Sequence, residues 1–161
     1  MMNAPVIDPA VGMADPAAAL HPLFARLVRE FGACVVTPDR CAAWAAEGGD
    51  RVLLLGGDPV RFPEALDVAV VLPELRRAHG DRFSIGVAAR EHEEALARQH
   101  GSQCWPALIF LRDGRYLGTL AGMHDWTDYV AQVGEMLART PTRAPIGIAA
   151  AGTGADAPSC H

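Results

Sequence analysis

The chain contains no lysine, because all 14 of its basic residues are arginine. This absence excludes Schiff-base chemistry, a phosphate-loop lysine and a lysine general base. The 19 acidic residues give a net charge of −5, which argues against a nucleic-acid partner because such binders usually present a basic face. No run of about 20 apolar residues is present, so no membrane span is predicted.

Cysteine is scarce and is not arranged as a redox pair. The four cysteines show neither C-x-x-C spacing nor a cluster of ligands, and they are Cys34, Cys41, Cys104 and Cys160. This usage predicts free thiols in a cytoplasmic protein. The segment before Arg26 has no basic residue and is interrupted by prolines, unlike a secretory signal. Cys160-His161 lacks two further ligands, so no metal site is predicted.

The chain is long enough for one domain. Residues 1–19 are rich in alanine and proline, and residues 140–161 are rich in alanine, glycine and proline without any period. Such segments bury too little to offset the entropy lost on ordering. We therefore expect a flexible extension over 1–19, one domain over 20–139 and a disordered tail over 140–161.

The hydrophobic pattern between these extensions alternates helices and strands. Thr37 is expected to cap the second helix, Glu91–His100 to form a solvated helix with surface histidines, and Cys34 to be buried. The order predicts an α/β fold with a mixed sheet of four to five strands and helices on both faces. The predicted helices are 20–31, 38–44, 66–78, 91–100 and 126–137, and the strands are 34–36, 52–55, 83–88, 107–111 and 116–120.

Proline and glycine punctuate the last third of the chain in a specific way. Trp105-Pro106 precedes a strand, and Gly114 and Gly122 follow the proline by eight and sixteen residues. Pro73 lies inside a predicted helix. In these features the chain resembles thioredoxins, which place a cis-proline, a hairpin glycine and a strand-end glycine at these offsets. The resemblance implies a thioredoxin-like fold over about residues 20–139.

The redox motif of that fold is missing. Thioredoxins begin their C-x-x-C eight residues before the helix proline, and here this slot reads Ala65-Leu66-Asp67-Val68. No thiolate is available there to attack a disulfide, and no second thiol to resolve it. Dithiol oxidoreductase activity at the usual position is excluded.

Three segments carry a narrower resemblance. They are the run Gly57-Asp58-Pro59-x-Arg61-x-Pro63-Glu64, the tripeptide Trp105-Pro106-Ala107, and Gly118 to Gly122 followed by His124-x-Trp126. In them the chain is similar to the thioredoxin-like accessory proteins of nickel–iron hydrogenase maturation (HyaE/HoxO/HupG type), which also lack C-x-x-C.

This resemblance implies a cytoplasmic chaperone that is neither an enzyme nor dependent on a cofactor. Its implied partner is the hydrogenase small-subunit precursor, bound through its twin-arginine signal peptide before export, with other maturation factors as further candidates.

The residues expected to bind this partner are Asp58, Glu64, Asp67, Trp105 and Pro106. The carboxylates lie around the former redox loop and would pair with arginines in bidentate bonds. They would equally favour a helix start, which is their simpler interpretation. Trp105 and Pro106 would flank the same groove, although Trp105 would also serve as a packing residue.

Two other functions stay open at this point. Cys104 lies two residues before Pro106, so a single-cysteine redox protein is the alternative, although no cationic neighbour in the sequence activates this thiol. A purely structural role would use the apolar stripe of residues 20–31 as an interface, although such a stripe is more simply a core-facing helix side.

Overall fold

The computed structural model describes residues 15–143. Most of the predicted extensions, together with Cys160-His161, lie outside these residues. The elements are α1 (Pro22–Phe31), β1 (Cys34–Val36), α2 (Cys41–Ala46), β2 (Asp50–Leu55), α3 (Glu64–Ala78), β3 (Phe83–Ala88), the short 3-10 helix η1 (Arg90–His92), α4 (Glu93–His100), β4 (Ala107–Arg112), β5 (Arg115–Ala121) and α5 (Trp126–Ala138).

The strands form one five-stranded sheet in the order β1-β3-β2-β4-β5. β3 pairs in parallel with β1 and β2, whereas β4 pairs antiparallel with β2 and β5. The continuous apolar run Val52–Leu55 lies in the central strand and is fully buried, as expected for a strand covered on both faces. The predicted mixed sheet with helices on both faces is confirmed.

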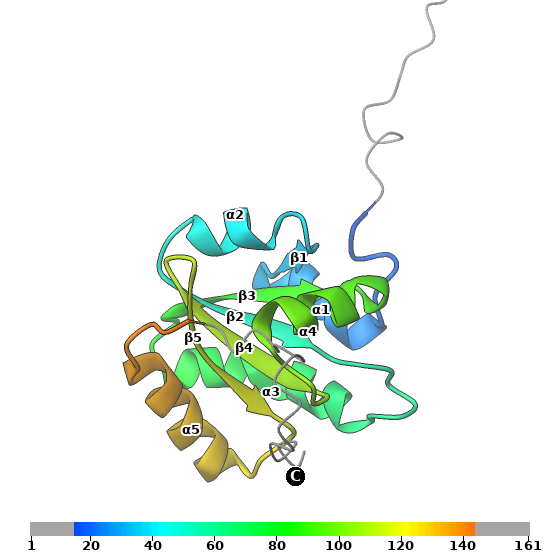
Figure 1. Cartoon of the computed structure of the whole chain (residues 1–161). Helices are drawn as coiled ribbons and strands as arrows, with labels where there is room; N and C mark the ends of the chain where they lie inside the picture. The colour runs from blue at the N-terminus through cyan, green and yellow to red at the C-terminus, as the bar shows by residue number, and fades with distance from the viewer. Residues whose placement is uncertain (1–14, 144–161) are drawn as a thin grey trace, which may run out of the picture.

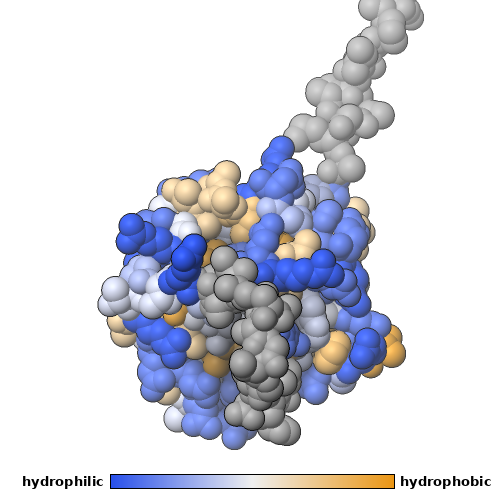
Figure 2. Space-filling model, viewed as in Figure 1, coloured by the Kyte–Doolittle hydropathy of each residue, from blue (hydrophilic) through white to orange (hydrophobic). Residues whose placement is uncertain are grey.

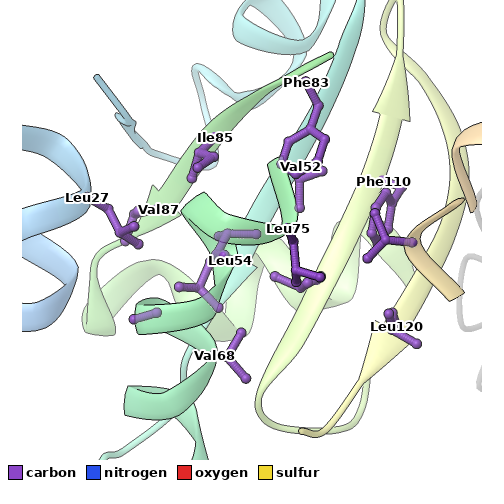
Figure 3. Packing of buried hydrophobic residues seen from close by; sticks show 14 of the residues in the cluster. Leu27, Val52, Leu54, Val68, Leu75, Phe83, Ile85, Val87, Phe110 and Leu120 are labelled. Carbon is purple, nitrogen blue, oxygen red and sulfur yellow. The ribbon is translucent and has the colours of Figure 1, made fainter. Parts of the chain in front are cut away.

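Helices lie on both sides of the sheet (Figure 1), and one apolar cluster fills the space on each side. One is formed with α1, α3 and α5, and Figure 3 shows Leu27, Leu54 and Leu75 meeting in it from a helix, the central strand and a second helix. The other is formed with α2 and α4 around Trp44 and Leu96. Among the described residues, no helix combines the length and apolar composition needed to cross a bilayer.

Two local predictions about helices are wrong. The second helix begins at Cys41, because residues 38–40 form a turn in which the Arg40 N–H donates to the Thr37 carbonyl at 3.1 Å. Thr37 is therefore not its cap. Glu91–His100 is not fully solvated either, because Glu93 and His100 are buried. His100 is accordingly no surface histidine, and its Nδ1 lies 2.9 Å from the Leu96 carbonyl oxygen.

Cys34 and Val70 are more exposed than their apolar neighbours suggested. β1 is an edge strand of the sheet, and Cys34 at its start is exposed rather than buried. Val70 lies among the apolar residues of the predicted helix 66–78 but is 44% exposed. The helical repeat of 3.6 residues turns Val68, Leu72 and Leu75 inward instead.

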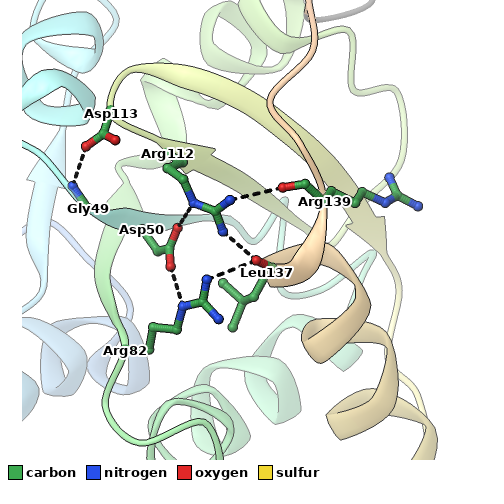
Figure 4. Close-up of polar contacts among 7 residues, drawn as sticks. All are labelled: Gly49, Asp50, Arg82, Arg112, Asp113, Leu137 and Arg139. Carbon is green, nitrogen blue, oxygen red and sulfur yellow. Dashed lines mark hydrogen bonds and ion pairs between the residues drawn. The ribbon is translucent and has the colours of Figure 1, made fainter.

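A buried carboxylate joins three elements at the opposite end of the sheet from the β2–α3 connection (Figure 4). Asp50 Oδ2 accepts from Arg82 Nε at 2.6 Å, and Oδ1 accepts from Arg112 Nε at 2.5 Å. Both guanidinium groups also donate to the Leu137 carbonyl, and Arg112 donates to the Arg139 carbonyl at 3.0 Å. Asp50 therefore holds the two arginines that satisfy the last carbonyls of α5.

Gly86 in β3 is expected to tolerate no side chain. A Cβ there would lie 2.7 Å from Trp44 Cη2 and 2.9 Å from Val36 Cγ2, both inside a packed core. We expect Gly86→Ala to lower the free energy of unfolding by about 2 kcal/mol in urea titrations, because overpacking forces rigid neighbours apart. Gly118→Ala is the matched control, since the Cβ there meets the flexible ends of Met136 and Arg139. Equal losses in both variants would contradict this prediction.

Candidate functional site

Three segments meet at one edge of the sheet because of its register. Leu55 at the end of β2 pairs with Ala107 at the start of β4, and Ala107 pairs with Ala121 at the end of β5. The segment that follows β2, the turn that precedes β4 and the segment that follows β5 are therefore neighbours. We call residues 56–63 the β2–α3 loop; it projects beyond the sheet in Figure 1.

The Trp105-Pro106 bond is cis, and it faces the β2–α3 loop. Gly57 has φ +76°, and a Cβ on it would lie 3.1 Å from the Cβ of Trp105. This contact confirms that the loop and the cis-proline turn lie side by side. On the other side, the Gly122 N–H donates to the Pro106 carbonyl at 2.8 Å.

Trp105 combines a packing role with free main-chain groups. Its half-buried indole packs against the cluster around Trp44. Its backbone N–H and C=O make no hydrogen bond with any of residues 15–143. A turn that leaves its main-chain donor and acceptor unpaired can pair with an extended peptide.

The β2–α3 loop is a compact turn around Asp58. The Asp58 Oδ1 accepts from the Val60 N–H at 2.9 Å, and the Asp58 carbonyl accepts from the Phe62 N–H at 2.8 Å. This turn leaves Val60 89% exposed. Arg61 lies over the Phe62 ring, 5.5 Å from its centroid. Figure 2 shows apolar surface gathered near this connection, bordered by hydrophilic residues.

Glu64 and Asp67 lie in the first turn of α3, directly after this loop. Both are exposed, and within the described part of the chain neither carboxylate makes an ion pair or hydrogen bond. Their position at a helix start fits the dipole interpretation, while their unpaired oxygens leave them available to a cationic partner. No contact places them against Trp105, so their membership of one site with it stays a prediction.

Exposed apolar side chains also follow β5 at this edge. Met123 is 37% exposed, and Trp126, the first residue of the predicted helix 126–137, is 49% exposed. The segment is held by an internal contact, since His124 Nε2 lies 2.8 Å from the Ala121 carbonyl oxygen. The exposure of Met123 and Trp126 was not predicted, because helical spacing gives the apolar side of a helix but not which of its residues the fold leaves uncovered.

Glu93 is the functional candidate that sequence reasoning missed altogether. Its side chain is 2% exposed, and the carboxylate accepts from the N–H of Gly56 at 3.0 Å and from that of Gly57 at 2.9 Å. Arg90 Nη1 lies 3.4 Å from Oε2. Burial raises the pKa of the Glu93 carboxyl to about 7, although the two N–H groups and Arg90 oppose this shift. A cavity of about 100 Å³ lies beside it, lined also by His21 and Phe24.

The three cysteines among residues 15–143 supply no reactive thiol. Cys104 is disulfide-bonded, so the prediction of a free thiol is wrong for this residue, and the redox alternative that relied on it has no support here. Burial raises the pKa of Cys34 and raises that of Cys41 to about 11, and both shifts disfavour the nucleophilic thiolate.

Comparison with known proteins shows which family this chain is similar to. The model of the family described as "Hydrogenase-1 expression protein HyaE" matches residues 23–129. The chain is 50% identical over 146 residues to the hydrogenase expression/formation protein HoxO of Cupriavidus necator, a match that covers 89% of this chain and 90% of that protein. It is 36% identical to the hydrogenase expression/formation protein HupG of Rhodobacter capsulatus, over 78% of this chain and 91% of that one.

The fold itself is shared with a redox protein. Desulfothioredoxin from Desulfovibrio vulgaris Hildenborough, in its reduced form, superposes with a TM-score of 0.53 at 18% identity, over 64% of this chain and 96% of that one. This likeness shows a thioredoxin-like fold and carries no inference about activity.

Proposed function

The chain belongs to the family of the hydrogenase-1 expression protein HyaE, and from this premise we propose that it acts in nickel–iron hydrogenase maturation as a non-redox chaperone. In this proposal it binds the small-subunit precursor in the cytoplasm, through the twin-arginine signal peptide, and holds it until export. It acts by binding, since the slot in which thioredoxins carry their C-x-x-C reads Ala65-Leu66-Asp67-Val68 here.

One observation carries the proposal. The unpaired main-chain N–H and C=O of Trp105 lie beside the β2–α3 loop, which leads directly to three solvent-accessible carboxylates, those of Asp58, Glu64 and Asp67. A signal peptide of this class is an extended chain with two arginines followed by an apolar stretch. The turn offers main-chain pairing, the carboxylates attract the arginines, and the exposed side chains of Val60 and Trp126 suit the apolar stretch.

The test is a binding titration with a synthetic peptide that carries paired arginines and an apolar stretch. Neutralising all three carboxylates as Asp58→Asn, Glu64→Gln and Asp67→Asn is expected to weaken binding about tenfold, because each exposed pair contributes up to about 1 kcal/mol. The affinity of the wild-type chain is expected to fall as salt is raised, since exposed charges are screened.

A charge-matched control separates this site from overall acidity. Glu30→Gln, Glu47→Gln and Glu135→Gln remove the same charge from exposed positions on α1, on α5 and just past α2, and they should leave the affinity unchanged. A peptide with both arginines replaced by glutamine should bind neither chain well. Equal binding by the site variant and the wild-type chain, both folded by circular dichroism, would remove the three carboxylates from the site.

A further inference from the structure

Glu93 belongs to α4, yet both of its carboxylate oxygens are used by the first residues of the β2–α3 loop. Oε1 accepts from Gly56 and Oε2 from Gly57, at 3.0 and 2.9 Å. Gly57 is the residue that contacts Trp105, and Asp58 follows it directly. One carboxylate from α4 is therefore bonded to the start of the loop that lies against the cis-proline turn.

The N–H groups of Gly56 and Gly57 make no other hydrogen bond with residues 15–143. The β2–β4 ladder ends one residue earlier, at the Leu55–Ala107 pair. Gly56 packs so closely on Phe24 that a Cβ would lie 2.5 Å from the ring, which leaves no room for a side chain to anchor the segment. Burying a carboxylate is costly unless it is hydrogen-bonded, and here the bonds are made to the loop.

We propose that Glu93 is a positioning residue for peptide recognition, which in its ionised form holds the β2–α3 loop against Trp105. This inference rests on the proposed function above. Protonation turns one oxygen into a hydroxyl donor, so the neutral side chain accepts the two N–H groups less well. The loop is then held less firmly, and the groups it presents, Asp58 and Val60, are less well placed for a peptide.

The charged and titratable neighbours of Glu93 define the controls. Among the described residues that line the adjacent cavity, these are Arg90 from η1 and His21 before α1. His21 Nδ1 accepts from the Leu23 N–H at 3.2 Å, a capping bond that asparagine can replace. Glu94, the next residue of α4, is exposed and pairs loosely with Arg98 at 3.8 Å.

The experiment uses the full chain as wild type, Glu93→Gln, Glu94→Gln and His21→Asn, titrated with the same twin-arginine peptide between pH 6 and 8. Glu93→Gln is expected to weaken binding about tenfold at pH 8, as loss of a charge-assisted bond would. Wild-type affinity should rise about fivefold from pH 6 to 8 as the carboxyl ionises, while that of Glu93→Gln stays flat. Glu94→Gln and His21→Asn should follow the wild type.

Amide exchange of Gly56 and Gly57 gives a second readout that needs no peptide. Exchange should be faster in Glu93→Gln than in Glu94→Gln. Unchanged exchange, or faster exchange with unchanged affinity, would overturn the inference, as would a pH profile that vanishes in His21→Asn. If Glu93→Gln does not fold, the pH dependence of peptide affinity in the wild type and in His21→Asn tests the inference. A fivefold rise in both chains supports it, and a flat profile in either overturns it. If the wild type binds no peptide, the proposed function fails, and exchange alone decides whether Glu93 holds the loop.

Discussion

Replacing Asp50 with asparagine is expected to lower the free energy of unfolding by about 2 kcal/mol, because removing a buried carboxylate leaves two partly buried guanidinium groups without their counter-charge. The Asp50 side chain is 7% exposed and accepts from both Arg82 and Arg112. An asparagine amide would point a donor at one of the two guanidinium groups. Both arginines also bond the Leu137 carbonyl, so the end of α5 loses its hold on the sheet.

Urea unfolding of the wild-type and variant chains measures this loss. The control is Glu30→Gln, which breaks the exposed Arg26–Glu30 pair on α1 and should cost about 0.5 kcal/mol or less. Amide exchange in the last turn of α5 should also accelerate in Asp50→Asn. If the two variants lose equal stability, the Asp50 cluster contributes no more than a surface pair and the prediction is wrong.

Periodicity was enough to predict the elements that carry the fold. The buried run Val52–Leu55, the hairpin at Asp113-Gly114 and the strand Phe83–Ala88 lie where their local patterns placed them. The cis bond before Pro106 is the state that the resemblance to thioredoxins implied, and spacing alone left it open. These features are local, since turn chemistry and a hydrophobic period of two or 3.6 residues act within a few positions.

The two buried carboxylates could not be predicted in this way. Glu93 is 37 residues from Gly56, and Asp50 is 62 residues from Arg112, so their partners are set by sheet topology and not by neighbouring sequence. A weak signal existed for Glu93. It shares the spacing i, i+3, i+4 and i+7 with Leu96, Ala97 and His100, which marks an inward helix face. The helix was expected to be solvated because it is charged, so this inward-facing pattern was not used.

The juxtaposition of the β2–α3 loop and the cis-proline turn was predicted, whereas the apolar side chains exposed nearby were not. The register of β2, β4 and β5 brings the β2–α3 loop to the cis-proline turn, as the resemblance to thioredoxins implied. Val60 and Trp126 at the same edge were not foreseen as exposed. Whether an apolar side chain is exposed depends on which other elements pack over it in the fold. Local propensity does not contain this information.

Ionisation of Glu93 is expected to make the wild-type chain less stable as the pH rises from about 4.5 to 7. The ordinary pKa of a glutamate side chain is 4.5, and burial raises the pKa of Glu93 in the folded state to about 7. Across this window the folded state holds a proton that the unfolded state has released, so the free energy of unfolding falls with pH, by up to about 3 kcal/mol. The stability that the protonated Glu93 carboxyl contributes is fully present below pH 4.5 and is lost above about pH 7.

Urea unfolding at pH 5 and pH 8 tests this with wild type, Glu93→Gln and the control Glu94→Gln. The Glu93→Gln variant lacks the titrating group, so its stability should fall less between the two pH values, while Glu94→Gln should follow the wild type. Parallel losses in all three chains would show that Glu93 ionises alike in both states. The expected result means that the charged carboxylate costs stability at the pH where it best holds the β2–α3 loop, as a residue retained for positioning would.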